Sequence, residues 1–423
     1  MTDFDTADFF RDGDLVADPY PYFDHLRARC PVQREPHHGV MLVTGYEEAL
    51  AVYHHPAAFS SCNSVSGPFP GFPVALEGDD VSPLIEEHRD ELPMSDQVIT
   101  FDPPKHTDHR RLLMRMLTPR RLKENEGFMW GHADRQIDEL IGDGACELVR
   151  GYASPFAMLV IADLLGVPEE DHGLFRRNLT RTTGLGSTGD DTLARNPLEF
   201  LYQQFGTYVE ERRRQPRQDV LSGLAGARFS DGSVPEVLDV VRIAANLFAA
   251  GQETTVRLLA ASLQRIAEDR DLQQRLREDP SRVPNFVEEM LRFESPVKGD
   301  FRLARVGTTV GGVPVPAGTT VMVLNGAANR DGRKFERPGE FDPERAEARQ
   351  HIAFGHGVHI CPGAPLARTE ARISIERLLD RTSDIRIDEE RHGPPGARRY
   401  TYTPTYILRG LQSLHLELTP AAH

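Results

Sequence analysis

The chain has 423 residues, and 49 Lys and Arg against 64 Asp and Glu give it a formal net charge of −15. This acidity argues against nucleic acid as a partner, while 39% hydrophobic and 27% charged residues suit a large buried core. No run of about 18 apolar residues predicts a membrane anchor, and four widely spaced cysteines without a CxxC pair fit a reducing, cytoplasmic setting.

The first half of the chain has mainly helical periodicity. Residues 1–17 are expected to form a loosely ordered tail, and residues 39–44 (GVMLVT) to form a strand. Residues 62–98 are irregular and rich in Gly, Pro and Ser, which is typical of a functional loop or of disorder. Helices are predicted after the strand up to Pro56, and at 84–88, 105 to about 144, 154–165 and 197–214.

The second half changes period once. Helical patterns cover 235–268, with a break at Gly251, and then 271–278 and 283–293. Residues 301–324 carry β-branched residues and two glycine turns, 311–312 and 317–318, which suits strands. A helix at 364–381 and a β-rich tail at 400–418 follow. The sum predicts a mainly α chain with a smaller β component (α+β), in one unit spanning residues 1–423.

Residues 354–363, FGHGVHICPG, are the most informative stretch. Their three glycines allow positive φ and close backbone approach. A helix beginning near Ala364 puts Cys361 at its N-terminus, where N–H groups and the helix dipole stabilise a thiolate. Such a thiolate is a good anionic ligand for haem iron and favours O–O cleavage. A buried cysteine at an ordinary helix start is the alternative, and the density of Gly and His argues against it.

This motif resembles the haem-binding loop of the cytochrome P-450 family. The residues at the family's spacings are Phe354, Gly357, His359, Cys361 and Gly363. Further motifs follow in the family's order, so that the resemblance covers about residues 18–418 and is nearest to soluble bacterial members. It implies the cytochrome P-450 fold, a triangular helix-rich prism around a buried haem b (iron protoporphyrin IX), with Cys361 as the axial ligand of the iron.

Residues 247–255, LFAAGQETT, lie midway along the longest predicted helix. Gly251 costs about 1 kcal/mol there relative to Ala, and the two threonines can bond back to carbonyls and bend the helix. An ordinary core helix is the alternative. The segment resembles the family's oxygen-binding kink, in which Ala250 and Gly251 leave room for O2 and haem, and Glu253 and Thr254 match the acid–alcohol pair that delivers protons.

Four further residues resemble the family's anchors for the haem propionates: His106, Arg110, Arg302 and His359. His106 and Arg110 are four apart on a predicted helix and so share a face. Partly buried carboxylates need charge-assisted partners, which these side chains supply. A solvated helix face is the alternative for such residues.

Glu289 and Arg292 form an ExxR step, a pattern that also occurs at 210–213 and 211–214. The resemblance selects the first pair, because it precedes the strand region. With Arg345 it matches the family's structural triad, which fixes the loop beneath the haem. We therefore assign these three residues to folding rather than to chemistry.

Electrons must come from outside, because the chain has no flavin or iron–sulfur segment. Seven basic residues lie between Lys105 and Lys123, either as a solvated helix face or as a docking site for an acidic electron carrier. Soluble bacterial relatives typically use a ferredoxin with its NAD(P)H-dependent reductase. The resemblance also places a mostly apolar substrate pocket, which favours a hydrophobic small molecule. Its residues, each of which also suits the core, are Val98, Thr100, Phe248, Ala249, Ala250, Val297, Phe301, Tyr402 and Thr403.

The leading hypothesis is a haem-thiolate monooxygenase that activates O2 with two electrons from a redox partner. It would hydroxylate or epoxidise a small-to-medium hydrophobic substrate of the terpenoid, aromatic, steroid or fatty-acid class. A peroxide-driven peroxygenase and a non-catalytic haem-based ligand binder are the alternatives. Glu253 and Thr254 argue against the peroxygenase, since family members that run on peroxide often lack this pair.

Overall fold

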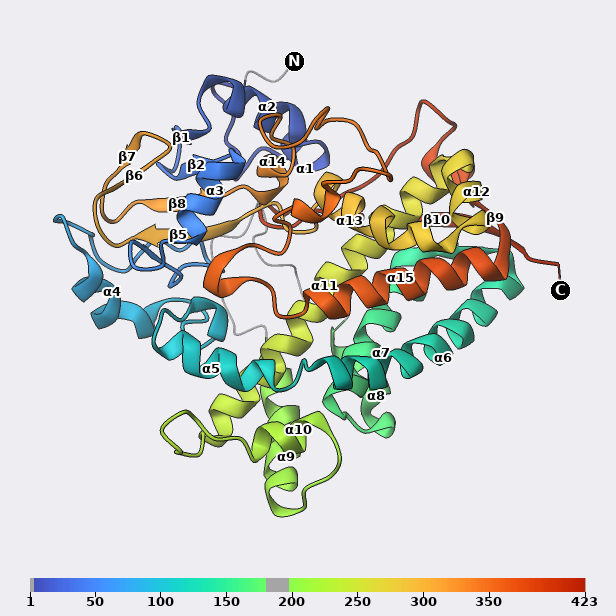
Figure 1. The fold of residues 1–423 in the computed structure, drawn as a ribbon, viewed down its shortest axis with the longest axis horizontal. Helices are drawn as coiled ribbons and strands as arrows, with labels where there is room; N and C mark the ends of the chain where they lie inside the picture. Colours follow the sequence, from blue (N-terminus) through green and yellow to red (C-terminus); the bar gives the residue numbers. More distant parts are fainter. Residues whose placement is uncertain (1–3, 180–197, 423) are drawn as a thin grey trace.

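The computed structural model describes residues 4–179 and 198–422 (Figure 1). About 52% of the structure is helical and a smaller part is sheet, which confirms the predicted mainly α, α+β class. The outline in Figure 1 is roughly triangular. The main sheet lies at one corner, α9 (Glu199–Arg214) and α10 (Val220–Ala225) lie at a second, and α12 (Arg270–Glu278) lies at the third.

Three helices have the bounds that the sequence predicts: α7 (Ser154–Leu165), α13 (Val283–Phe293) and α15 (Ala364–Arg381). α7 shows why. Pro155 stands in its first turn, where no backbone N–H is needed, and Gly166 ends it with a φ of +81°. The other described helices are α1 (Asp14–Ala17), α2 (Tyr20–Arg29), α3 (Tyr46–Tyr53), α4 (Ser82–His88), α8 (His172–Leu179), α14 (Asn325–Ala328) and α16 (Glu389–His392). Pro197, the expected first residue of α9, lies outside the described residues.

The helical run expected from 105 to about 144 divides into α5 (Lys105–Met114) and α6 (Pro119–Asp143). Proline restricts the residue before it to extended backbone, and Thr118 accordingly has a ψ of 149°. The Thr118 side chain accepts the Arg121 N–H and caps α6. Period alone does not separate two helices that share one apolar face.

The central helix is α11 (Val237–Glu268), which spans about 48 Å. It packs against α7, α9 and α15 in the largest apolar core. The helix continues through Gly251 without the predicted break. Packing on several sides outweighs the helix cost of one glycine, which is about 1 kcal/mol. None of the described helices combines the length and hydropathy needed to cross a bilayer.

The main sheet has the strand order β1-β2-β8-β5-β3, with β2 and β8 parallel and the other neighbours antiparallel. β6 and β7 form a hairpin closed by Gly311 and Gly312, both at positive φ, as the sequence predicts. A third sheet, β4-β10-β9, lies near the C-terminus. The strands are β1 (Val32–Arg34), β2 (Met41–Val43), β3 (Phe59–Ser60), β4 (Ala145–Glu147), β5 (Asp300–Ala304), β6 (Thr308–Val310), β7 (Val313–Val315), β8 (Thr320–Val323), β9 (Thr382–Ile387) and β10 (His415–Pro420).

The N-terminal residues are more ordered than the expected loose tail. Phe9 and Phe10 are buried, and their rings pack against Tyr22 and Phe301 in an apolar cluster between α2 and the main sheet. Two aromatic rings bury enough apolar surface to hold an acidic segment against the fold.

The ExxR step at Glu289 and Arg292 lies completely buried on α13. Arg292 donates twice to Glu289, at 2.7 Å each, and Arg345 Nε donates to the same carboxylate at 3.2 Å. Arg292 also donates to the carbonyls of Asn329, Pro338 and Glu340, which lie on the path to the cysteine loop. The structure thus brings together the three residues that the sequence assigned to folding.

We predict that Glu289→Gln lowers the free energy of unfolding by about 3–5 kcal/mol, because it leaves two buried guanidinium groups without their carboxylate. Glu210→Gln is the matched control, since Glu210 is exposed in a second ExxR step of the sequence. Denaturant unfolding followed by circular dichroism measures both. Equal losses in the two variants would contradict the structural role of the triad.

Candidate active site

The cysteine loop between β8 and α15 is shaped by one close backbone approach. Gly357 has a φ of +69°, and a Cβ added there would lie 2.3 Å from the carbonyl oxygen of Tyr53. Only glycine fits this position. The Cys361 N–H donates to the Phe354 carbonyl at 2.9 Å, which closes the loop just before α15. Gly363, at the N-cap of α15, has an ordinary φ of −82° and does not use the positive φ that glycine allows.

Cys361 lies just before the first turn of α15 and is partly buried. Burial raises the pKa of this thiol, and the backbone N–H groups of Gly363 and Ala364 and the charge of Arg110 offset only part of that rise. Pro362 has no N–H to add. The two N–H groups at the start of α15 therefore favour the thiolate, as the sequence analysis expects, while burial opposes it.

The two histidines of the expected haem site meet although 253 residues separate them in the chain. The rings of His106, on α5, and His359, in the cysteine loop, have centroids 3.9 Å apart. Both ring nitrogens of His106 and the Nε2 atom of His359 are buried. None of these three atoms has a hydrogen-bond partner within residues 4–179 and 198–422. Buried polar atoms are rarely left unsatisfied, so these face a polar group that the chain does not supply.

Two arginines surround the same histidines. Burial, together with the positive charges of Arg110 and Arg302, lowers the pKa of His106 to about 4 and that of His359 to about 2. Arg110 donates to the Ile360 carbonyl, and Arg302 donates to Asp300 at 2.8 Å. The side chains of His106, His359, Arg110 and Arg302 thus converge. Arg302 pairs with the carboxylate of Asp300, whereas Arg110 donates only to a backbone carbonyl. Two carboxylates fit this arrangement.

Apolar side chains next to the sulfur are unusually exposed. Val358 and Ile360 in the cysteine loop have 42% and 44% of their surface accessible, and Ala250 of α11 is exposed in mid-helix. A flat apolar ring with two carboxylates and a central metal would cover these groups and satisfy the histidines. The residues present therefore fit haem.

A second group of side chains holds the cysteine loop in place. Arg368 of α15 lies over the Phe354 ring at 4.7 Å and donates to Glu288 at 2.7 and 3.0 Å. His351 shares that carboxylate at 3.1 Å. These charges hold the pKa of Glu288 at about 2 against its burial. The sequence analysis missed this anchor, because its members are distant in the chain.

The middle of α11 carries the expected acid and alcohol. The Thr254 hydroxyl donates to the Ala250 carbonyl at 2.9 Å, the back-bond that the sequence predicts. Glu253, 38% exposed, pairs with Arg257 one turn further on. A Cβ added at Gly251 would reach Ile161 only at 3.6 Å, so protein packing does not demand glycine at this position.

Glu370 is a buried acid that the sequence analysis missed. It lies on α15, nine residues after the cysteine, and accepts the Thr255 hydroxyl of α11 at 2.9 Å. Burial raises its pKa from the ordinary 4.5 to about 8, so that it is mostly protonated at neutral pH. Its spacing from Leu366 and Ile373 puts it on the apolar face of the helix, and that pattern is the signal that would have found it.

The expected substrate residues fall into two groups. Ala249, Val297, Tyr402 and Thr403 are partly exposed. Ala250 is exposed. The remaining four are buried in packing of their own: Val98 lies in the largest core, Phe248 contacts Phe175 and Phe205, Thr100 donates to backbone carbonyls, and Phe301 packs against Phe10 and Tyr406. Phe301 stands next to Arg302 on β5, and neighbouring residues of a strand point to opposite faces.

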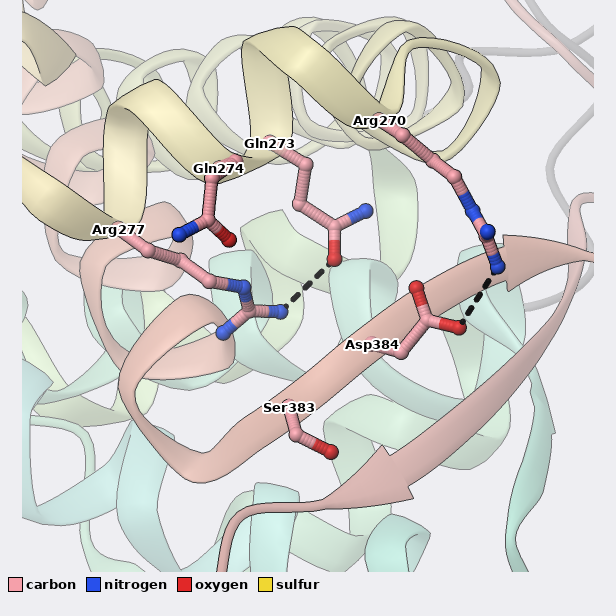
Figure 2. Close-up of a pocket in the computed structure, with 6 residues that line it drawn as sticks. All are labelled: Arg270, Gln273, Gln274, Arg277, Ser383 and Asp384. Carbon is pink, nitrogen blue, oxygen red and sulfur yellow. Dashed lines mark hydrogen bonds and ion pairs between the residues drawn. The ribbon is translucent and has the colours of Figure 1, made fainter.

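A groove between α12 and β9 is lined only by polar residues (Figure 2). Arg277 there donates to Gln273 at 2.9 Å and to the Thr382 hydroxyl at 3.1 Å, and Arg270 donates to Asp384 at 3.4 Å. These side chains connect α12 to β9, which follows α15 directly. The groove lies at the C-terminal end of α15, far from Cys361, and its contacts are structural.

Known proteins resemble the whole chain. The family model described as Cytochrome P450 matches residues 196–390. The cytochrome P450 monooxygenase PikC of Streptomyces venezuelae is 33% identical, over 95% of this chain and 91% of its own length. Vitamin D(3) 25-hydroxylase of Pseudonocardia autotrophica is 31% identical over 96% of each. The substrate-free structure of cytochrome P450 CYP150A6 of Mycobacterium marinum superposes with a TM-score of 0.94 at 56% identity, covering 99% of this chain and 100% of that one.

We predict that Glu370→Gln stabilises the chain at alkaline pH. The folded chain holds the Glu370 proton up to about pH 8 and the unfolded chain releases it near 4.5, so the wild type loses stability across that interval, on the order of 3–5 kcal/mol. The variant has no such loss, and the advantage should disappear below about pH 4.5. Unfolding across pH 4–9 measures it, with Glu278→Gln, an exposed site, as control. A pH-independent difference would contradict the raised pKa.

Proposed function

The chain belongs to the bacterial cytochrome P450 monooxygenase family, and we propose that it is a haem-thiolate enzyme that oxidises a hydrophobic small molecule with O2. The observation that carries this proposal is the set of side chains near Cys361: His106 and His359 have buried ring nitrogens without partners, and Arg110 and Arg302 add positive charge beside them. Haem b, bound there, supplies a redox-active iron at which O2 is reduced.

The chain's residues hold that cofactor at both ends. Cys361 supplies the sulfur ligand, and the N–H groups of Gly363 and Ala364 orient the sulfur. His106, Arg110, Arg302 and His359 bind the propionates, since each offers a donor or a positive charge to a carboxylate. The anchor of Glu288 and Arg368 stabilises the loop, so that the sulfur need not reorganise during turnover.

The residues of α11 move protons. Glu253 is exposed enough to exchange with water, and Thr254 has a hydroxyl on the next position of the same helix. A carboxylate and an alcohol at these positions pass protons one at a time to oxygen. Thr255 and the protonated Glu370 extend this polar group away from solvent, and Glu370 holds a further proton at neutral pH.

Electrons come from a partner, for which we propose a ferredoxin and its NAD(P)H-dependent reductase. Arg110 links α5 to the cysteine loop, so the exposed bases after it lie near the proximal side of the haem site. Arg111, Arg115, Arg120 and Lys123 are exposed there, in a chain of charge −15. A local positive surface of this kind steers an acidic carrier. We also place the enzyme in the cytoplasm, since all four cysteines are free thiols.

The substrate class is proposed as apolar: terpenoid, aromatic, steroid or fatty acid. The partly exposed residues among those expected, Ala249, Val297 and Tyr402, support an apolar lining. A peroxide-driven cycle and a non-catalytic ligand binder remain the alternatives. Coupled product formation with ferredoxin and reductase, compared with peroxide alone, separates all three.

We predict that the dithionite-reduced protein under carbon monoxide shows the strongly red-shifted Soret band of a thiolate-ligated haem, and that Cys361→Ala abolishes it. Absorption spectroscopy measures the band. Cys30→Ala, a partly exposed thiol, is the control and should leave it unchanged. A Cys361→Ala variant with the same band as the wild type would overturn the proposed function.

We predict that Arg111→Glu or Arg115→Glu slows reduction by ferredoxin several-fold at low salt and much less at high salt, because screening removes the steering charge. Stopped-flow reduction at two ionic strengths measures it. Arg270→Glu, in the groove of Figure 2, reverses an equally exposed charge elsewhere and should have little effect. Equal slowing at both ionic strengths would remove the docking site.

A further inference from the structure

Arg257 is a buried guanidinium with unused donors. It lies on α11, one turn beyond Thr254, and only 6% of its surface is accessible. One of its nitrogens donates to Glu253. Its Nε and Nη1 atoms are buried and have no hydrogen-bond partner among residues 4–179 and 198–422. Leaving two charged N–H donors unsatisfied costs several kcal/mol, which indicates a missing acceptor.

The missing acceptor lies toward the C-terminal turn. A Cβ added at Gly410 would come within 2.9 Å of Arg257 Nη1 and 2.4 Å of its Cγ. Gly410 accepts the Thr403 N–H, so the guanidinium stands against the turn that carries Tyr402 and Thr403. Both Thr254 and this turn border the expected substrate space. The unused donors therefore lie between Glu253 and this turn, next to residues that the resemblance assigns to the substrate pocket.

The charges around Arg257 do not balance. Arg409 pairs with Glu294 at 2.6 Å, and Glu253 pairs with Arg257. Lys298 is 2% exposed and has no carboxylate partner in the described part of the chain. Burial and the charges of Arg409 and Arg257 lower the pKa of Lys298 to about 7. Arg330 also lies 3.7 Å from Glu294, so that four basic side chains face the two carboxylates.

Resting on the proposed function, we infer that the substrate is an apolar molecule with a carboxylate group, and that Arg257 binds this carboxylate while Lys298 adds positive charge. One carboxylate has two oxygens for Nε and Nη1, which is the geometry of a bidentate arginine pair. It also adds negative charge to a cluster in which basic side chains outnumber carboxylates. An uncharged terpene or steroid satisfies neither requirement.

The test compares acids with their methyl esters on the holoenzyme. A panel of fatty, aromatic, terpenoid and steroid carboxylic acids is titrated, each beside its own ester. The spin-state change of the haem and isothermal calorimetry give the Kd. We expect at least one acid to bind about tenfold or more tightly than its ester. No acid preference in any pair, or no acid that binds, overturns the inference.

Two variants localise the effect. Arg257→Gln should bring the Kd of the preferred acid to that of its ester and leave the ester within about twofold. Gly410→Ala should do the same with the guanidinium still present, because the added methyl group displaces it. Arg265→Gln, two turns along the helix beside Phe293 and Phe341, is the control. If the preference for the acid over its ester persists in both Arg257→Gln and Gly410→Ala, the role of Arg257 is overturned.

The carbon monoxide spectrum keeps the two proposals separate. An intact red-shifted band with no acid preference overturns the substrate class and leaves the haem-thiolate function standing. Loss of the band in the wild type overturns both. Lys298→Met is a second probe should Arg257→Gln fail to fold, and it should weaken acid binding several-fold without changing ester binding. An unchanged acid Kd in Lys298→Met overturns the role of Lys298.

Discussion

The structure depends on the surroundings of one sulfur atom, that of Cys361, where burial opposes the thiolate and nearby N–H groups favour it. Two backbone N–H groups and Arg110 act on Cys361, yet the net effect of its surroundings is to raise the thiol pKa. Burial of a charge is costly unless a counter-ion meets it. A cation at the sulfur would offset that cost, and the iron of the proposed haem is such a cation.

Much of the surrounding fold holds that atom in one place. Glu289 binds Arg292 and Arg345 in a dry network, and neighbouring Glu288 binds His351 and Arg368. Two adjacent glutamates of α13 therefore position the cysteine loop together. Glu289 fixes the chain that leads to the loop, and Glu288 fixes the loop itself. Networks of this kind are stable only when every member is paired, which explains why all of them lie together in the core.

On the other side of the opening, α11 combines tasks that conflict. It is the central packing helix, yet its middle turn carries an exposed acid, a back-bonded threonine and a half-satisfied arginine. Glu253 is held by Arg257, so any group that draws the guanidinium away also frees the acid. Binding of an anionic substrate and proton movement would then act on the same pair of side chains.

The sequence by itself determined the class of the fold, the bounds of three helices and the residues of the cysteine loop. Local signals were enough for these: Pro155 and Gly166 delimit α7, and the spacing of FGHGVHICPG identifies the loop. Residues three apart share a helix face, so the spacing allowed three ExxR pairs, and the family resemblance selected Glu289 with Arg292.

Only the tertiary structure decided which side chains are left without partners. The contact of His106 with His359, the burial of Glu370 and the unused donors of Arg257 depend on segments far apart in the chain. Phe301 and Phe248 were placed by position, but strand alternation and core packing turned them away from the opening. A residue's neighbours along the chain fix its backbone, whereas its charge state and its missing partners follow from burial by the whole fold.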